Sequence, residues 1–299
     1  MTDMVRVLMV DLLVERAAFG HGGNQEVIKP FAARGEVELL LVTPQMQSFE
    51  AGEKAEFGEF LLTEEDVPHW DDEFTFWQST TVELEGKTVS FRRIVMPMYE
   101  DDEKMANWLE SIDVDAVVCS GSRRNVSIWE DWMGPTASLL RASSNAGRPT
   151  LGICFGHQLL CYALGATIER ADSLSSGIWD LDLTNNGSND ELLTSHVSDG
   201  SCVAGLFTHR DHVMTVPESC SLLCSTSHNG VTAVRVHADN GDALPAWGIQ
   251  FHPEAARARI DRAYGWGHIT EEEYSSFKGE HDGAEILSSF ARIVSQYQA

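Results

Sequence analysis

Cationic residues are scarce in this sequence. Its 299 residues include only five lysines, and 21 lysines and arginines stand against 46 acids, which gives a net charge of −25. Such a surface repels nucleic acid and anionic membranes, so we expect neither as a partner. Two explanations of the acidity stay open: it keeps the protein in solution, or it suits a salt-rich cytoplasm in which ions screen the self-repulsion.

A long apolar run is also missing. The first candidate, residues 5 to 14, is interrupted by Arg6 and Asp11, whereas a membrane-spanning helix needs about 20 apolar residues. The N-terminal stretch lacks the basic flank and the small-residue cleavage site of a signal peptide. We therefore expect a cytoplasmic location.

Motifs for metals and nucleotides are lacking as well. The six cysteines form no paired CxxC spacing and indicate no disulfide framework. Cys220 and Cys224 could form a metal pair, but we favour simple packing within a strand. His209, Asp211 and His212 could also hold a metal, but no further ligand element accompanies them. Because no Walker-type loop occurs either, we expect no metal and no cofactor.

Buried apolar runs alternate with helical segments. The runs at 5–10 and 36–42 flank a helix expected over residues 24–34, which is a β-α-β beginning. The alternation resumes with strands at 92–96, 115–120 and 149–154 and helices over 102–112, about 130–145 and 155–164. Runs of this kind are typical of a parallel sheet covered on both faces. We predict a three-layer α/β/α fold with a doubly wound, mostly parallel sheet.

We expect residues 1–299 to form one domain with two additions. An insertion over about 45–91 begins with an acidic stretch, which has ten acids and one lysine over residues 50–73, and continues into a hairpin that turns at residues 85–87. After Ala166 the chain is rich in short β-like runs, among them 166–170, 178–183 and 203–208. A helical extension is expected over about 268–299.

The segment GICFG lies where the strand at 149–154 meets the following helix. Gly152 and Gly156 flank Cys154 and lack the Cβ atoms that would collide in a sharp strand-to-helix turn. At the start of the helix, backbone N–H groups and the helix dipole favour a thiolate. The segment therefore predicts a nucleophilic cysteine, although a buried, inert cysteine in a tight turn would have the same local sequence.

A base and an orienting acid follow a later apolar strand, in FHPE. His252 precedes a proline, which favours extended geometry, so Glu254 projects to the same side and can hold one ring nitrogen. Cys154, His252 and Glu254 form a candidate triad. The alternative is a helix-start histidine followed by a first-turn acid.

A developing oxyanion also needs hydrogen-bond donors. The SGS turn at 120–122 offers the N–H of Gly121, and the helix start offers that of Phe155. Both lie at the carboxyl edge of the expected sheet, where ligands bind in such folds.

Together, GICFGHQLL around Cys154, FHPE at 251–254 and SGS at 120–122 resemble the class I glutamine amidotransferases. The likeness is closest to stand-alone members related to the glutaminase domain of GMP synthetase and to the γ-glutamyl peptidases. It covers residues 92–254 well and residues 1–42 loosely. The resemblance implies a flavodoxin-like fold, a Cys-His-Glu triad at the three positions above, and a glutamine pocket that involves Phe155 and Gln158.

Further substrate contacts are expected around this pocket. His209, in THRDHV, matches a histidine-containing segment beside the pocket of relatives, and Ser122 of the SGS turn is another candidate. Arg123 and Arg124 replace a proline-containing turn that is common in relatives. These two arginines could bind a substrate carboxylate or could merely meet the acidic surface.

The resemblance implies cleavage of the γ-amide of glutamine, a small-molecule substrate, to glutamate and ammonia. If the ammonia is transferred onward, a separate synthetase subunit is the expected partner. The alternative is a γ-glutamyl peptidase that acts on γ-glutamyl peptides. A third possibility is a catalytically silent regulatory protein on the same fold.

Overall fold

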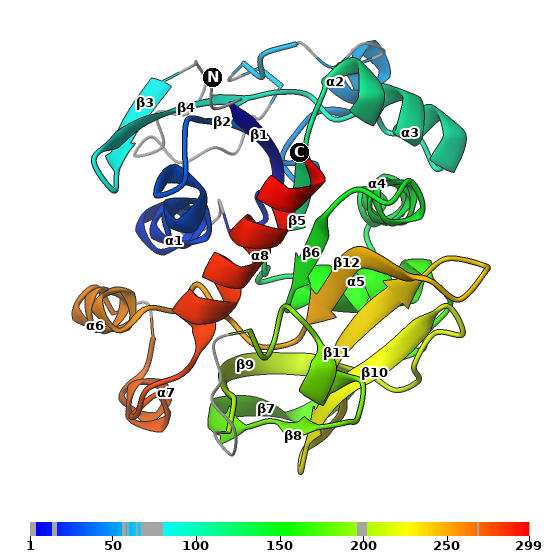
Figure 1. Ribbon diagram of the computed structural model, residues 1–299. Coiled ribbons are helices and arrows are strands. Elements are labelled where there is room, and N and C mark those ends of the chain that lie inside the picture. Colours follow the sequence, from blue (N-terminus) through cyan, green and yellow to red (C-terminus); the bar gives the residue numbers. More distant parts are fainter. Residues whose placement is uncertain are drawn as a thin grey trace.

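A computed structural model describes residues 4–13, 17–55, 58, 60–63, 65–66, 80–195, 202–267 and 269–298. A sheet of ten strands forms the centre of this part of the chain (Figure 1). From one edge to the other, the strands are β3 (Thr80–Leu84), β4 (Lys87–Arg93), β2 (Val37–Val42), β1 (Val5–Val10), β5 (Ala116–Cys119), β6 (Thr150–Ile153), β12 (Ala243–Ile249), β11 (Asn229–His237), β10 (Cys220–Thr226) and β8 (Asp182–Leu183). Strands β4 to β12 in this order run parallel, and the outer pairs are antiparallel.

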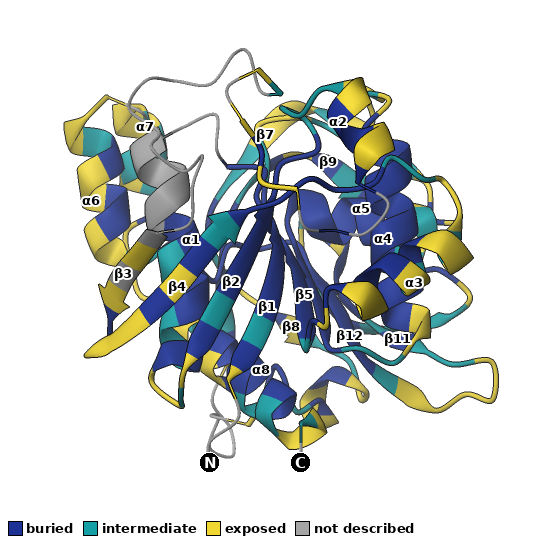
Figure 2. Cartoon of the chain, turned by 90° about the horizontal axis from the view of Figure 1, so that it is seen from above, coloured by how far each residue is buried: buried dark blue, intermediate teal, exposed yellow. Residues whose placement is uncertain are grey.

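Helices cover both faces of the sheet (Figure 2). On one face α1 (Ala17–Ala32) packs against α8 (Gly283–Tyr297), and on the other α3 (Asp102–Ser111), α4 (Met133–Asn145) and α5 (Phe155–Ala163) pack in series. Phe31 meets Phe290 edge to face in the first layer, and Trp132 stacks on Phe155 in the second. The predicted three-layer α/β/α fold with a mostly parallel sheet is confirmed.

The predicted hairpin is present, but it belongs to the main sheet. Its turn lies at Glu85 and Gly86, whose φ values of 50° and 71° are typical of a tight two-residue hairpin. β4 then continues to Arg93 and pairs in parallel with β2, so residues 92–96 do not begin a separate strand. The buried residues of β4 occupy alternate positions, at Val89, Phe91 and Arg93. The strand therefore has no continuous apolar run in the sequence.

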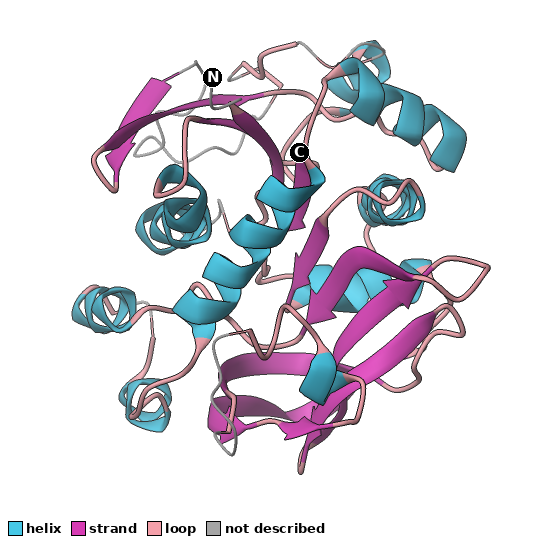
Figure 3. Cartoon of the chain, viewed as in Figure 1, coloured by secondary structure: helices cyan, strands magenta, loops and turns pink. Residues whose placement is uncertain are grey.

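A second, two-stranded sheet lies beside the antiparallel end of the main sheet (Figure 3). It pairs β7 (Ile168–Asp180) with β9 (Ala204–Val213). The β-run predicted at 166–170 and the first half of the run predicted at 178–183 therefore belong to one long strand, whereas Asp182–Leu183 form β8 of the main sheet. The intervening residues are polar, so their sequence shows no β pattern. β9 contacts both α5 and β11, which brings this small sheet against the start of α5.

The remaining elements are short. They are α2 (Phe49–Lys54), a 3₁₀ turn at Gly187–Asn189, α6 (Arg257–Gly265) and α7 (Glu271–Ser276). Within the predicted insertion, residues 67–79 lie outside the described residues. The division of the chain into one domain with an insertion and a helical extension stays a prediction. No helix in the described segments combines the length and the apolar character needed to cross a bilayer.

Candidate active site

The carboxyl ends of three adjacent parallel strands, β5, β6 and β12, meet at one edge of the main sheet. Gly121 follows the end of β5 by two residues, Cys154 directly follows β6, and His252 follows β12 by three. Three distant chain segments are thereby brought to the edge at which ligands bind in doubly wound sheets.

Cys154 occupies a sharp bend between β6 and α5. Its backbone has φ 51° and ψ −99°, which few residues with a Cβ adopt. The flanking glycines permit this bend: a Cβ on Gly152 would lie 2.5 Å from the carbonyl oxygen of Gly156, and one on Gly156 would collide with that of Cys119. The strand-to-helix elbow predicted from GICFG is present.

The imidazole and the carboxylate of the candidate triad are hydrogen-bonded to each other. His252 Nδ1 and Glu254 Oε1 are 2.8 Å apart, and both side chains are largely buried. Arg259 of α6 supports this pair, because its Nη1 donates a hydrogen bond of 2.8 Å to the main-chain oxygen of Glu254. Nothing in the sequence singles out Arg259, which is buried by contacts with distant segments.

His252 also lies beside Cys154. A Cβ placed on Gly121 would be 2.9 Å from Cε1 of His252 and 3.7 Å from Cβ of Cys154, so the main chain at Gly121 adjoins both. The other ring nitrogen, Nε2, has no hydrogen-bond partner within the described residues. It is therefore free to exchange a proton with the sulfur or a substrate.

The charges of this group reinforce one another. Burial lowers the pKa of His252, but the electrostatic and hydrogen-bond interactions with Cys154 and Glu254 outweigh it and raise that pKa well above its ordinary value. Burial raises the pKa of Glu254, but the cationic His252 and Arg259 outweigh it and hold that pKa below its ordinary value. The site thus favours a protonated imidazole beside the Glu254 carboxylate.

The two candidate oxyanion donors belong to residues that adjoin Cys154. The N–H of Phe155 is in the first turn of α5, where backbone N–H groups have no acceptor within the helix. The turn at Gly121 is fixed by Ser120, whose Oγ accepts a hydrogen bond from Leu12 N–H (2.9 Å) and donates to the Gly121 carbonyl (3.1 Å). The assignment of Gly121 and Phe155 to an oxyanion site stays a prediction.

A pocket of about 310 Å³ lies against Cys154, Phe155 and His252, and the predicted substrate residues also line it. Gln158 is fixed there, because its Nε2 donates to the main-chain oxygen of Asp211 (2.8 Å) and to Oε1 of Gln250 (3.0 Å). Ser122 accepts a hydrogen bond from the Arg124 N–H at 3.0 Å. The pocket thus brings together Ser122, Cys154, Phe155, Gln158, His209 and His252.

His209 gives the pocket an uncharged wall. Burial and the neighbouring His212 lower the pKa of His209 to about 2, and the two rings lie 4.8 Å apart. Across the described ranges, no cluster of three or more His, Cys, Asp or Glu side chains could hold a metal ion. A neutral histidine at this position can accept or donate a hydrogen bond without adding charge.

Asp211 joins two walls of the pocket. Its carboxylate accepts hydrogen bonds from the N–H and the Oγ of Ser127, each 2.8 Å long, and so connects the loop after β5 with β9. The sequence suggests Asp211 only as a metal ligand and misses this role. The available signal was an acid in the middle of a β-like run, where a carboxylate needs buried partners.

Two residues that follow the elbow are structural. His157 Nε2 lies 3.2 Å from the main-chain oxygen of Val231, and burial lowers the pKa of His157 to about 4. Cys161 is buried one helical turn onward, and burial raises its pKa well above the ordinary value. Burial likewise raises the pKa of Cys220 to about 12, as expected of a packed thiol.

Comparison with known proteins gives consistent matches. The family model "Glutamine amidotransferase class-I" matches residues 79–264. A glutamine-hydrolysing GMP synthase of Anaplasma marginale is 25% identical over 212 residues, covering 66% of this chain and 38% of that protein. One subunit of the glutamine-hydrolysing GMP synthase of Halobacterium salinarum is 30% identical over 155 residues, covering 51% of this chain and 73% of its own length. The chain thus spans less than two fifths of the Anaplasma protein.

A solved structure shares the fold. The glutamine amidotransferase of Thermotoga maritima superposes with a TM-score of 0.58, and the match covers 98% of each chain. The sequence identity is 15%, so this likeness concerns the fold alone.

Proposed function

The chain belongs to the class-I glutamine amidotransferases and is related to the GMP synthases, and from this premise we propose that it hydrolyses the γ-amide of glutamine through a thioester on Cys154. The observation that carries the proposal is the hydrogen-bonded pair of His252 and Glu254 beside a cysteine on a strand-to-helix elbow. Packing alone requires neither the strained bend nor a buried charge pair at its side.

The reaction proceeds in two stages. The Cys154 sulfur, having passed its proton to His252, attacks the γ-carbonyl carbon, and the N–H groups of Gly121 and Phe155 hold the oxyanion. The carbon–nitrogen bond breaks as His252 returns the proton to the leaving nitrogen, and ammonia departs. Water then loses a proton to His252 and adds to the thioester, and glutamate is released from the sulfur. Glu254 keeps the imidazole oriented throughout.

We further propose that the ammonia serves a separate synthetase subunit. The Halobacterium relative is named as one subunit of GMP synthase, and the match covers most of it. This similarity supports a partner that supplies the acceptor of the nitrogen. Co-purification of a synthetase with the tagged chain from its own cells, together with faster glutamine hydrolysis in the complex, would support the partnership.

The test of the proposed function uses the purified full chain with glutamine. Glutamate and ammonia should appear in equal amounts, and the intact mass of acid-quenched protein should show a glutamyl adduct that Cys154→Ala lacks. Cys202→Ala is the matched control, because Cys202 is exposed and outside the pocket. Equal turnover by wild type and Cys154→Ala, or none by the wild type with any γ-glutamyl compound, would overturn the proposal.

A further inference from the structure

The mouth of the Cys154 pocket is cationic, unlike the protein as a whole. Acids outnumber lysines and arginines by 46 to 21 over the chain, but four arginines and two acids occur among the described residues that line this pocket. These six are Arg123, Arg124, Arg170, Arg210, Asp211 and Glu273. A local excess of positive charge in an acidic protein favours an anionic ligand.

The two acids of the mouth are already engaged. Asp211 accepts both hydrogen bonds from Ser127, and Glu273 accepts from the N–H and the Oγ1 of Thr270 at 2.8 and 3.0 Å in the N-cap of α7. The approach of Arg170 to Asp211 is loose, with 3.8 Å between Nη1 and Oδ1. The carboxylates of the mouth therefore leave most of the guanidinium donors unused.

The arginines differ in how they are engaged. Arg123 makes no hydrogen bond or ion pair with the residues that the structure describes, and the Arg210 side chain donates to the main-chain oxygen of Asp172 at 3.1 Å. Arg124, in contrast, pairs with Glu130 at 3.3 Å. Arg123 comes from the turn that carries Gly121, and Arg210 from β9, so cations approach the pocket from two segments.

We propose that Arg123, Arg170 and Arg210, here called the arginine rim, bind a carboxylate on the leaving group of a γ-glutamyl substrate. This inference rests on the proposed thioester chemistry of Cys154 but extends it beyond glutamine. Glutamine has no net charge, and its leaving group is ammonia. A γ-glutamyl peptide has one further carboxylate, on the amine that departs, and guanidinium groups bind carboxylates through paired, charge-assisted hydrogen bonds.

Such a substrate is cleaved by the same two stages as glutamine. The Cys154 sulfur bonds to the γ-carbonyl carbon, and the bond from that carbon to the peptide nitrogen breaks. His252 supplies the proton that the amine takes up, and the amine leaves with its carboxylate unchanged. Water then adds to the thioester carbon, and the carbon–sulfur bond breaks to release glutamate.

The experiment compares γ-glutamylglycine, γ-glutamylglycinamide and glutamine with the purified full chain. The first two differ only in the terminal carboxylate. We expect kcat/KM to be about tenfold higher for the carboxylate form, in line with one hydrogen bond to a charged group. This preference should shrink with added salt. Arg123→Gln should bring the ratio close to one, whereas Arg34→Gln, which removes an exposed charge beyond the end of α1, should leave it unchanged.

Two results would overturn the arginine rim. One is equal turnover of the carboxylate and amide forms by the wild type. The other is an equal loss for all three substrates in Arg123→Gln, because the arginine would then bind the α-carboxylate that they share. In both cases the wild type still hydrolyses glutamine, so the proposed function would stand.

A binding measurement covers the remaining case. Titration of Cys154→Ala with γ-glutamylglycine and γ-glutamylglycinamide should show about tenfold tighter binding of the carboxylate form. This difference should disappear when Arg123→Gln is combined with Cys154→Ala. If no substrate is turned over, the proposed function fails. The titration then tests the arginine rim by itself, and equal affinities for the two compounds would refute it.

Discussion

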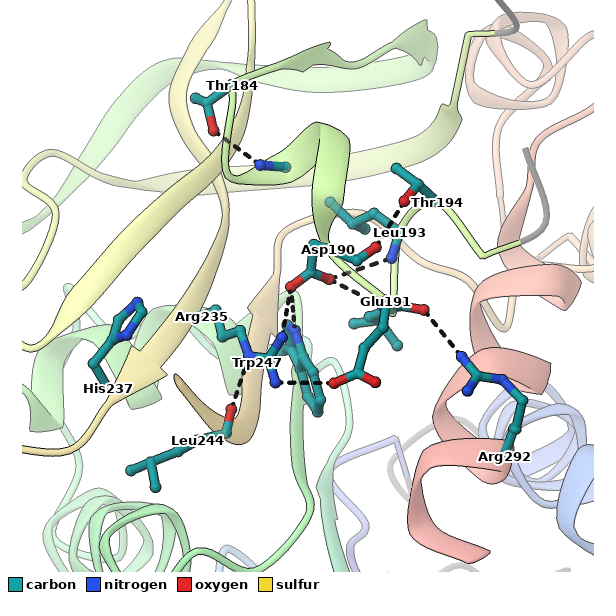
Figure 4. Close-up of polar contacts among 12 residues, drawn as sticks. Thr184, Asp190, Glu191, Leu193, Thr194, Arg235, His237, Leu244, Trp247 and Arg292 are labelled. Atoms are coloured by element: carbon teal, nitrogen blue, oxygen red, sulfur yellow. Dashed lines mark hydrogen bonds and ion pairs between the residues drawn. The ribbon is translucent and has the colours of Figure 1, made fainter. Parts of the chain in front are cut away.

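Two buried carboxylates, Glu254 beside His252 and Asp190 at the end of the 3₁₀ turn, are used in opposite ways. Figure 4 shows Asp190 with donors on both oxygens: Oδ2 accepts from Trp247 Nε1 (3.1 Å) and Arg235 Nη1 (3.3 Å), and Oδ1 accepts from the N–H groups of Leu192 (3.0 Å) and Leu193 (3.4 Å). Glu254 has one side-chain oxygen on His252, and Oε2 has no hydrogen-bond partner in the described part of the chain.

The two networks also end differently. Around Asp190, Arg235 additionally binds Glu191 and stacks over Trp247, and Arg292 of α8 reaches the Glu191 carbonyl. This closed network joins the segment after the 3₁₀ turn to β11, β12 and α8. The network at Glu254 instead ends at His252, which lines the pocket. Its Nε2 has no hydrogen-bond partner among the described residues. A complete set of partners serves stability, whereas an unfilled position serves chemistry.

The pKa shifts follow the same division. Burial raises the pKa of Asp190 despite its donors, whereas the cations beside Glu254 outweigh burial and lower the pKa of that carboxyl. At Asp190 the donors therefore offset only part of the cost of burying the charge. At Glu254 the neighbouring cations keep the carboxylate charged, and this charge raises the pKa of the adjacent imidazole.

The sharpest separation of the two regions is expected from Cys154, the proposed nucleophile. Cys154→Ala should lower glutamine turnover by at least about 10⁴-fold, because no other group replaces the thioester. The free energy of unfolding, from urea titration, should change little compared with Cys202→Ala. A large loss of stability with residual activity would place Cys154 with the structural residues instead.

The next largest effect concerns the acid of the pocket. Glu254→Gln should reduce kcat by about 10³- to 10⁴-fold, because the imidazole loses its orienting anion. Burial lowers the pKa of His252 and the Glu254 charge raises it, so the variant should lose the imidazolium proton at lower pH. The alkaline limb of the kcat/KM profile should therefore move to lower pH. A profile that keeps its alkaline limb would show that Glu254 does not act on His252.

Asp190 should give the reverse result. Asp190→Ala leaves Arg235 and Trp247 without their acceptor and should lower the free energy of unfolding by about 3 kcal/mol. Turnover per folded molecule should be retained. Asp239→Ala is the control, because Asp239 is exposed and should change stability by less than about 0.5 kcal/mol. Equal effects of the two substitutions would remove the contrast between the networks.

A smaller effect tests the spacing within the pocket. A Cβ on Gly121 would be 2.9 Å from Cε1 of His252, so Gly121→Ala should displace the ring and lower kcat/KM about 10- to 100-fold. Gly35→Ala is matched to it, because nothing lies within 4 Å of a Cβ on Gly35. If both variants retain full activity, the imidazole does not depend on the main chain at Gly121.

Whether a contact could be predicted from the sequence depends on how far apart its two residues lie along the chain. The elbow at Cys154 and the pairing of His252 with Glu254 involve residues one or two apart, so local spacing indicates both. The link from Asp211 to Ser127 and the contacts of Asp190 with Arg235 and Trp247 join residues that only the fold brings together. Arg259 lies five residues from Glu254, but no sequence pattern marks it. The fold class followed from apolar runs, but the place of β4 in the main sheet and the middle of β7 were missed because their side chains alternate or are polar.

The backbone at Cys154 has a consequence for the balance between durability and activity. A residue with a Cβ at φ 51° and ψ −99° holds conformational strain of about 1–3 kcal/mol, which glycine would avoid. Cys154→Gly should therefore have a free energy of unfolding about 1 kcal/mol higher than that of the wild type, after glycine's greater entropy in the unfolded chain is subtracted. On the proposed mechanism, the chemistry of its sulfur is the reason why this strained position is not a glycine.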